Sequence, residues 1–248
     1  MMPFERAWLY HAHHAPYQDD IFFWLDLASN CAPPVLELGC GTGRVCRALQ
    51  EAGIPVMGVD LSPEMLAVLR EQEMPQKRVP VFQGDARRLG VSDAAFGLVI
   101  FPCNTFGTFD EISRTAILDE VFRVLRPGGE FVVSIPNPLA LLEMPARGEP
   151  EVEEEFTHPL SGLPVQVSSE WQRTGDRFVQ HWLYDTLLPD GGVRREVWES
   201  AHYLLPPEIW VQTLDAHGLD VIALYGDFAG TAFHPDADLL ILHAEKWA

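Results

Sequence analysis

Three glycines at alternate positions break a short apolar run in the first fifth of the chain. The stretch Val35–Val45 reads V-L-E-L-G-C-G-T-G-R-V. Its first four residues fit a buried parallel strand, and a helical pattern begins at Arg44. Gly39, Gly41 and Gly43 let the backbone turn sharply and leave no Cβ in the way of a bound molecule. The unpaired N–H groups at the start of the following helix suit a phosphate or a carboxylate. We therefore predict that a ligand binds at this turn.

The spacing of the glycines separates two classes of protein that use such a turn. A dinucleotide fingerprint reads G-x-G-x-x-G, but its third glycine is replaced here by Arg44, and the glycines run G-x-G-x-G behind an acid. The pattern E-L-G-C-G-T-G resembles motif I of the class I S-adenosylmethionine-dependent methyltransferases. This resemblance implies that Glu37 lies near the methionine part of the cofactor while the glycine turn passes under it. A purely structural glycine-rich turn is the alternative.

Two later positions agree with this resemblance. Asp60 follows a strand expected at residues 56–59 and can accept hydrogen bonds from ribose hydroxyls. The run G-D-A at residues 84–86 is similar to the position where the family's acid and the following amide meet adenine. A helix cap or a solvated loop acid at Asp60, and an ordinary Asp-led turn at Asp85, are the alternatives. The resemblance implies S-adenosylmethionine contacts from Tyr17, Glu37, Gly39, Cys40, Gly41, Gly43, Asp60, Leu61, Asp85, Ala86 and Phe101.

The rest of the chain alternates strand and helix patterns, which predicts an α/β fold with right-handed crossovers. Strands are expected at 35–38, 56–59, 79–83, 96–101, 130–135, 219–225 and 238–245. The resemblance implies a doubly wound, mostly parallel seven-stranded sheet with an antiparallel last strand, the Rossmann-like methyltransferase fold. We expect residues 1–248 to form a single methyltransferase domain.

Residues 146–205 have a different pattern. Three alternating stretches, at 165–173, 178–188 and 193–205, are separated by T-G-D and D-G-G turns. These are hairpin signals, so we predict an inserted antiparallel sheet of three or four strands. The acidic run before it predicts a solvated edge. Aromatic strand faces form core, oligomer contacts or a substrate wall. The substrate-side candidates are Asn104, Phe106, Trp171, His181, Tyr184, His202 and Tyr203, and no catalytic residue is singled out.

The charge of the chain argues against a nucleic-acid substrate. It carries 36 acidic and 17 basic residues, a formal net charge of −19, which repels a phosphate backbone. The fourth expected strand ends in P-C-N-T-F and lacks the N-P-P-Y/F pattern with which amino-methylating nucleic-acid enzymes hold a flipped base.

The cysteines and histidines give no metal or disulfide pattern. The four cysteines form no C-x-x-C pair and fit reduced thiols of a cytoplasmic protein. His11, His13 and His14 lie close together, but no acid or cysteine stands among them and Pro16 breaks any helix, so we expect no metal. The resemblance implies that Tyr10 and Tyr17 cover the cofactor, and packing at the surface is the alternative. No signal-peptide core or membrane-length apolar run is apparent.

These observations together predict S-adenosylmethionine-dependent methyl transfer to a small-molecule acceptor through a nitrogen, oxygen or carbon nucleophile. The expected partner is that acceptor, with no nucleic acid and no membrane, and a homodimer is possible. A non-catalytic S-adenosylmethionine-binding or interaction module is the main alternative, since the substrate half carries no signature. A nicotinamide-dependent oxidoreductase is disfavoured because the third glycine is missing.

Overall fold

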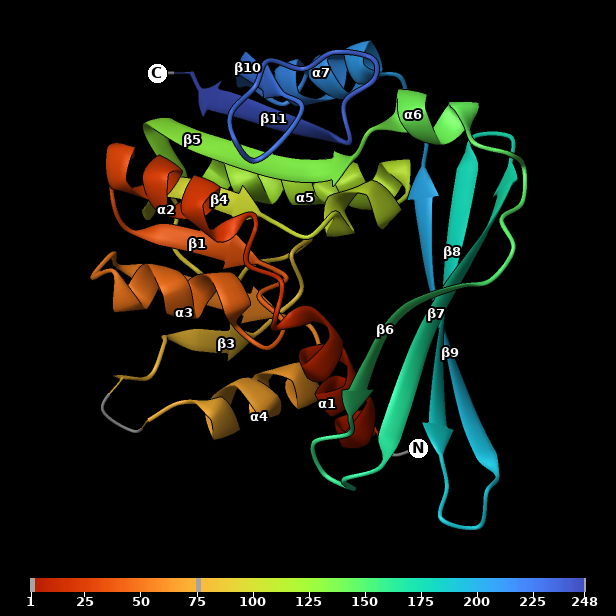
Figure 1. Cartoon of the computed structure of the whole chain (residues 1–248). Helices are drawn as coiled ribbons and strands as arrows, with labels where there is room; N and C mark the ends of the chain where they lie inside the picture. Colours follow the sequence, from red (N-terminus) through yellow and green to blue (C-terminus); the bar gives the residue numbers. More distant parts are fainter. Residues whose placement is uncertain (1–2, 75–76, 248) are drawn as a thin grey trace.

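A seven-stranded sheet forms the centre of the computed structural model, which describes residues 3–74 and 77–247. Its strands are β1 (Val35–Leu38), β2 (Val56–Asp60), β3 (Val81–Gln83), β4 (Phe96–Phe101), β5 (Leu125–Pro136), β10 (Leu219–Tyr225) and β11 (Leu239–Lys246), in the order β10-β11-β5-β4-β1-β2-β3 (Figure 1). β11 is antiparallel to both of its neighbours, and the pairings among β1 to β5 are parallel. The predicted doubly wound sheet with an antiparallel last strand is confirmed.

Helices cover both faces of this sheet. The helices of the described residues are α1 (Pro3–His14), α2 (Ile21–Asn30), α3 (Arg44–Glu51), α4 (Pro63–Gln72), α5 (Glu111–Val124), α6 (Pro138–Glu143) and α7 (Pro207–Asp215), with a 3-10 turn η2 at Thr105–Thr108. Apolar residues of α5 and α7 pack in one core cluster, and those of α2 and α3 pack in another. β1 and β4 are buried along their whole length, because both faces of a covered parallel strand lose contact with water.

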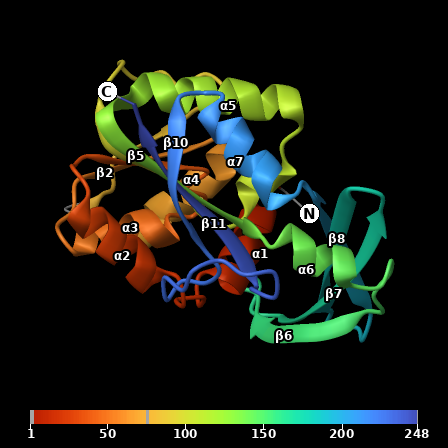
Figure 2. The same cartoon turned by 90° about the horizontal axis from the view of Figure 1, so that it is seen from above.

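A second sheet lies beside the first and holds four antiparallel strands. These are β6 (Glu151–Thr157), β7 (Pro164–Thr174), β8 (Arg177–Leu187) and β9 (Val193–Tyr203), in sequence order (Figures 1 and 2). The alternating stretches therefore form the expected hairpins, while the extent of the insertion as a domain element, 146–205, stays a prediction. The acidic run contributes β6, an edge strand with most of its residues exposed.

The N-terminal segment forms a helix that connects the two sheets, which the sequence patterns did not predict. α1 ends at His14, before Pro16. Ala7 and Trp8 pack against Val68 of α4, whereas Leu9 packs against Val165 and Val167 of β7. Because Leu9 is fully buried, its burial stabilises this arrangement by about 1.5 to 3 kcal/mol.

Gly97 in β4 lies in close contact with the backbone of the segment before β1. A Cβ at this position would lie 1.9 Å from the carbonyl oxygen of Ala32, a backbone atom that cannot rotate away. Gly97→Ala should therefore lower the free energy of unfolding by about 3 kcal/mol or more, measured by denaturant titration. Gly90→Ala is the matched control because nothing lies within 4 Å of its Cβ. Equal stability of the two variants would contradict the packing described.

Candidate active site

The glycine turn after β1 has the shape that the sequence predicts. Gly39, Gly41 and Gly43 all have positive φ, at 64°, 54° and 82°. At Gly43 the left-handed backbone and the neighbouring Leu69 both exclude a side chain, because a Cβ would lie 2.5 Å from Leu69 Cδ1. Phe101, at the end of β4, is buried directly against Gly39. The turn thus lies at the carboxyl ends of β1 and β4, where parallel sheets bind ligands.

Asp60 fixes the turn from the neighbouring strand. Its Oδ2 accepts a hydrogen bond from the Gly41 amide at 2.7 Å, and its Oδ1 accepts one from the Ser62 amide at 2.8 Å. Burial raises the pKa of Asp60, while these two amides act in the opposite direction. A carboxylate offers about four lone-pair positions, so Asp60 retains acceptor capacity for a ligand.

Glu37 is a buried carboxyl group beneath the turn, with a side chain only 3% exposed. Burial raises its pKa to about 7, although contact with Cys46 and the charge of Arg44 act in the opposite direction. In the part of the chain that the structure describes, its Oε2 has no hydrogen-bond partner. A buried polar atom without a partner is costly, so this oxygen is an available acceptor site.

The predicted cofactor contact Leu61 follows β2, and the predicted adenine contacts Asp85 and Ala86 follow β3. Leu61 is 62% exposed beside Asp60. Asp85 accepts hydrogen bonds from Arg87, at 2.7 Å to Nη2, and this contact lowers the pKa of Asp85. Ala86 packs against the core cluster that contains β4 and β5. The adenine assignment of Asp85 and Ala86 stays a prediction.

Arg44 is a central residue of the site that the sequence analysis did not identify. It pairs with the buried carboxylate of Asp20, donates to the backbone carbonyl of Tyr17 at 3.2 Å and to Cys103 Sγ at 3.1 Å. The guanidinium carbon of Arg44 lies over the Tyr17 ring, 5.2 Å from its centroid. A signal existed in the sequence: Arg44 opens α3, where a cation is disfavoured by the helix dipole and therefore needs a compensating acid.

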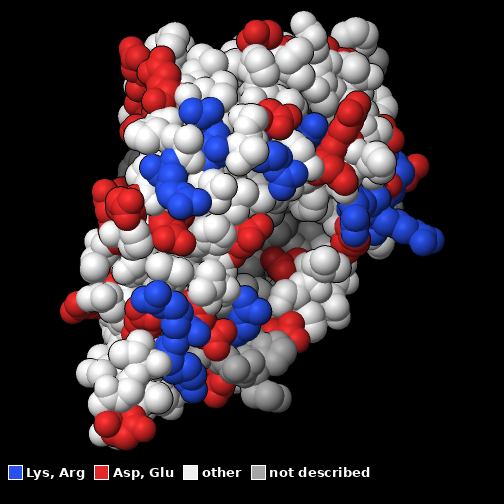
Figure 3. All heavy atoms as spheres, turned by 90° about the vertical axis from the view of Figure 1, so that its right-hand side faces the viewer, with Lys and Arg blue, Asp and Glu red and all other residues white. Residues whose placement is uncertain are grey.

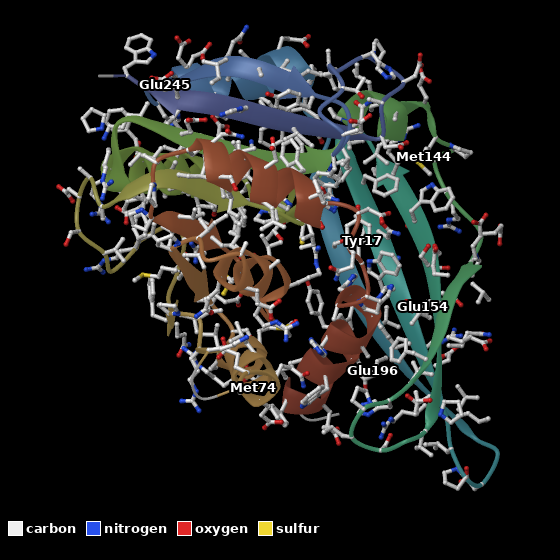
Figure 4. The ribbon with its side chains drawn as sticks, turned by 60° about the vertical axis from the view of Figure 1, so that its left-hand side comes forward. Tyr17, Met74, Met144, Glu154, Glu196 and Glu245 are labelled. Atoms are coloured by element: carbon white, nitrogen blue, oxygen red, sulfur yellow. The ribbon has the colours of Figure 1, made fainter. Side chains whose placement is uncertain are left out.

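A cavity of about 820 Å³ extends from this cluster to the four-stranded sheet. Tyr17 lies between the two sheets, and Met144 lies at another part of the lining (Figure 4). Of the predicted residues, Tyr17, Asn104, Trp171 and His202 line the cavity. Tyr10, which the resemblance places over the cofactor, and Trp182 of the predicted aromatic sheet also line it, and the sequence analysis did not select His14 or Trp198. Acidic side chains border a hollow on the face seen in Figure 3.

Four substrate-side candidates do not line this cavity. Phe106 is fully buried among core rings, and Tyr184 is fully buried with a 2.8 Å hydrogen bond to His13. His181 lies between Glu170 and Glu199 on the other face of β8 from Trp182. Tyr203 packs against the guanidinium groups of Arg114 and Arg177. Strand alternation separates His181 from its neighbour Trp182, because successive side chains point to opposite faces.

The structure adds two observations on metals and membranes. Within residues 3–74 and 77–247, no three His, Cys, Asp or Glu side chains come together as a group that could hold a metal ion. No helix in these ranges is both long enough and apolar enough to cross a membrane.

The burial of Glu37 predicts a pH-dependent stability. Since its folded pKa is raised, the folded state binds this proton more tightly, and stability falls as pH rises from about 4.5 to about 7. Glu37→Gln should therefore become more stable relative to wild type across this range, by about 3 kcal/mol in unfolding free energy. Denaturant titrations at several pH values measure this difference. Glu51→Gln on α3 controls for loss of one carboxylate, and a pH-independent difference for Glu37→Gln would refute the assignment.

Comparison with known proteins agrees with this geometry. A family model described as a methyltransferase domain matches residues 35–129. The putative methyltransferase YqeM of Bacillus subtilis is 30% identical over 134 residues, and the match spans about half of each chain, 53%. The cypemycin N-terminal methyltransferase of a Streptomyces species is 30% identical over 200 residues, which cover 80% of this chain and 77% of that one.

A solved structure extends the likeness to the whole fold. The CcbJ methyltransferase from Streptomyces caelestis superposes with a TM-score of 0.75 at 24% identity, covering 92% of this chain and 88% of that one. The glycine turn, the acid at the end of β2 and the strand order with an antiparallel last strand agree with these similarities. The chain therefore belongs to the class I S-adenosylmethionine-dependent methyltransferases.

Proposed function

We propose that this protein transfers the methyl group of S-adenosylmethionine to a small-molecule acceptor bound between the two sheets. The observation that carries the proposal is the cavity of about 820 Å³, which adjoins the glycine turn through Arg44 and is walled by β7, β8 and β9. This volume lies within the range of small-molecule sites, about 300 to 1,000 Å³. Its lining combines aromatic rings with a few polar groups, as such sites do.

The residues at the glycine turn fit S-adenosylmethionine. The unpartnered Glu37 Oε2 is a buried acceptor for a cationic amino group, and the spare lone pairs of Asp60 suit ribose hydroxyls. Exposed Leu61 beside Asp60 offers an apolar surface to a base. When bound, the cofactor supplies an electrophilic methyl group on a sulfonium.

The side chains of the protein position the acceptor and the methyl donor and exclude water from the site. A Cβ at Gly41 would lie 3.7 Å from the Tyr10 ring, so α1 closes over the turn. The same ring lies 6.3 Å from Trp198 of β9, so Tyr10 connects the cofactor half to the acceptor half. Holding an acceptor and a methyl donor in one geometry removes much of the entropic barrier, and this can supply most of the acceleration.

Other properties stay expectations that rest on the sequence. The acceptor is the expected partner, and the net charge of −19 disfavours nucleic acid. A cytoplasmic location and a homodimer are carried forward as proposals. The family assignment disfavours the oxidoreductase alternative, whereas a non-catalytic binding module requires the experiment below.

The proposal predicts binding and turnover separately. Isothermal titration with S-adenosylhomocysteine should show saturable binding, and incubation with methyl-labelled S-adenosylmethionine plus a panel of small amines, alcohols and carboxylates should label at least one acceptor. Heat from the ligand without any labelled product would favour the non-catalytic module. Absence of heat up to about millimolar ligand would contradict the proposal itself.

Asp60→Ala should weaken S-adenosylhomocysteine binding by about tenfold to a hundredfold. The substitution removes charge-assisted acceptors worth about 1.5 to 3 kcal/mol and also frees the Gly41 amide. Asp60→Asn, which keeps one acceptor oxygen, should lose less. Titration calorimetry gives the affinities and thermal melting of the free proteins verifies folding. Unchanged affinity in a folded Asp60→Ala protein would exclude the ribose role.

A further inference from the structure

Four rings from α1 and the four-stranded sheet form one wall of the cavity. This aromatic wall consists of Tyr10, His14, Trp182 and Trp198, all of which line the cavity. The centroid of the Tyr10 ring lies 4.4 Å from that of His14 and 6.3 Å from that of Trp198, on which Tyr10 stacks. The His14 ring meets the Trp182 ring edge-on, with 6.2 Å between their centroids. Trp182 and Trp198 are directly opposite each other on β8 and β9. Aromatic rings from α1, β8 and β9 therefore border one region of the cavity.

The aromatic wall is uncharged. Burial, together with nearby His13 and Arg44, lowers the pKa of His14 to about 3, so its imidazole is neutral at physiological pH. Burial raises the pKa of the Tyr10 hydroxyl, which keeps it a neutral phenol. His14 also ends α1, where the helix dipole places partial negative charge.

The fixed charges around the aromatic wall favour a cation. Among the described residues that line the cavity, Arg44 is the one Lys or Arg, and the carboxylate of Asp20 balances its charge. Glu153 lines the cavity and accepts a hydrogen bond from Ser169 Oγ. Its charge acts on His13, which places it near the end of α1. Glu199 is a second carboxylate of the lining. The Arg6 guanidinium lies over the Trp198 ring, 5.1 Å from its centroid, but Arg6 does not line the cavity. Within the lining, a cation near the wall thus meets aromatic rings and carboxylates.

We propose that the acceptor is an alkylamine whose nitrogen lies against the aromatic wall, with Tyr10, Trp182 and Trp198 stabilising the ammonium that methylation produces. This inference rests on the proposed function and specifies its substrate class. Cation–π attraction acts within about 6 Å of a ring centroid and is strongest for Trp.

The chemistry of an amine suits the groups at hand. Before transfer, the ammonium form releases its proton to water. The nitrogen lone pair of the neutral amine forms the new N–C bond while the S–C bond breaks with its electron pair left on sulfur. The positive charge therefore moves to nitrogen, beside the rings. A primary or secondary amine then releases a proton to water when the product leaves.

A hydroxyl acceptor fits the lining less well. It needs a general base with a pKa near the working pH. Burial lowers the pKa of both lining histidines, to about 3 for His14 and about 4 for His202. A carboxylate acceptor would meet Glu153 without a free cation to balance it. An amine instead becomes a nucleophile once its ammonium form has released a proton to water.

Binding measurements without turnover test the proposal. The probes are tetramethylammonium, its neutral isostere tert-butanol and the similarly shaped anion pivalate, each titrated by calorimetry or NMR into protein saturated with S-adenosylhomocysteine. Wild type should prefer tetramethylammonium over both other probes. Trp182→Ala and Trp198→Ala should each weaken the binding of tetramethylammonium by about 3- to 30-fold. Trp247→Ala is the matched control because this exposed tryptophan does not line the cavity. Trp182→Phe and Trp198→Phe keep a ring if the alanine variants do not fold, and should give smaller losses.

The outcomes separate this inference from the proposed function. Labelled product from amines supports both the proposed function and the amine assignment if the Trp182 and Trp198 variants lose this product together with their affinity for tetramethylammonium. Product from alcohols or carboxylates only, or equal binding of tetramethylammonium and tert-butanol, would overturn the amine assignment while methyl transfer stands. Failure of S-adenosylhomocysteine to bind would instead remove the proposed function.

Discussion

The hydrogen bond from the Gly41 amide to Asp60 is the contact on which the cofactor half of the structure depends. It ties the turn after β1 to the end of the neighbouring parallel strand, at 2.7 Å. β1 and β2 are paired in register along their length, so the turn and the acid arrive together at one edge of the sheet. The glycines make the turn possible, since Leu69 excludes a side chain at Gly43. The acid then holds the turn open toward a ligand, because a charge-assisted hydrogen bond is about twice as strong as a neutral one.

The acceptor half of the structure depends on α1, which packs between α4 and the four-stranded sheet. The helix inserts Leu9 into the core of the four-stranded sheet and Ala7 and Trp8 against α4. The 2.8 Å hydrogen bond between His13 and Tyr184 adds a polar contact to the same junction. Because these contacts fix the rotation of α1, Tyr10 and His14, one helical turn apart, both line the cavity.

Burial controls the protonation of the site more than individual charge pairs do. It raises the pKa of Glu37 and lowers the pKa of His14 and His202, in each case toward the neutral form. The ion pair of Arg44 with Asp20 is the contrasting case, since both charges are retained by pairing and further hydrogen bonds. The cavity thus combines one balanced ion pair with neutral rings, and this is the physical basis of its preference for a cationic acceptor in our proposal.

The sequence by itself determined the order of strand, turn and helix, which follows from local patterns: the glycine spacing and strands bounded by turn residues. The doubly wound sheet and the family followed from the resemblance that the glycine turn, Asp60 and the G-D-A run carry. Strand alternation also predicted the hairpins of the second sheet. Only the tertiary structure decided which of their aromatic residues face the cavity, since alternation defines two faces but does not say which one meets the site. Trp182 therefore lines the cavity while His181 does not, and Tyr184 is enclosed in the core. Arg44 and Asp20, and Tyr10 and Trp198, meet across long stretches of chain, and such contacts arise from packing of whole elements rather than from any local pattern.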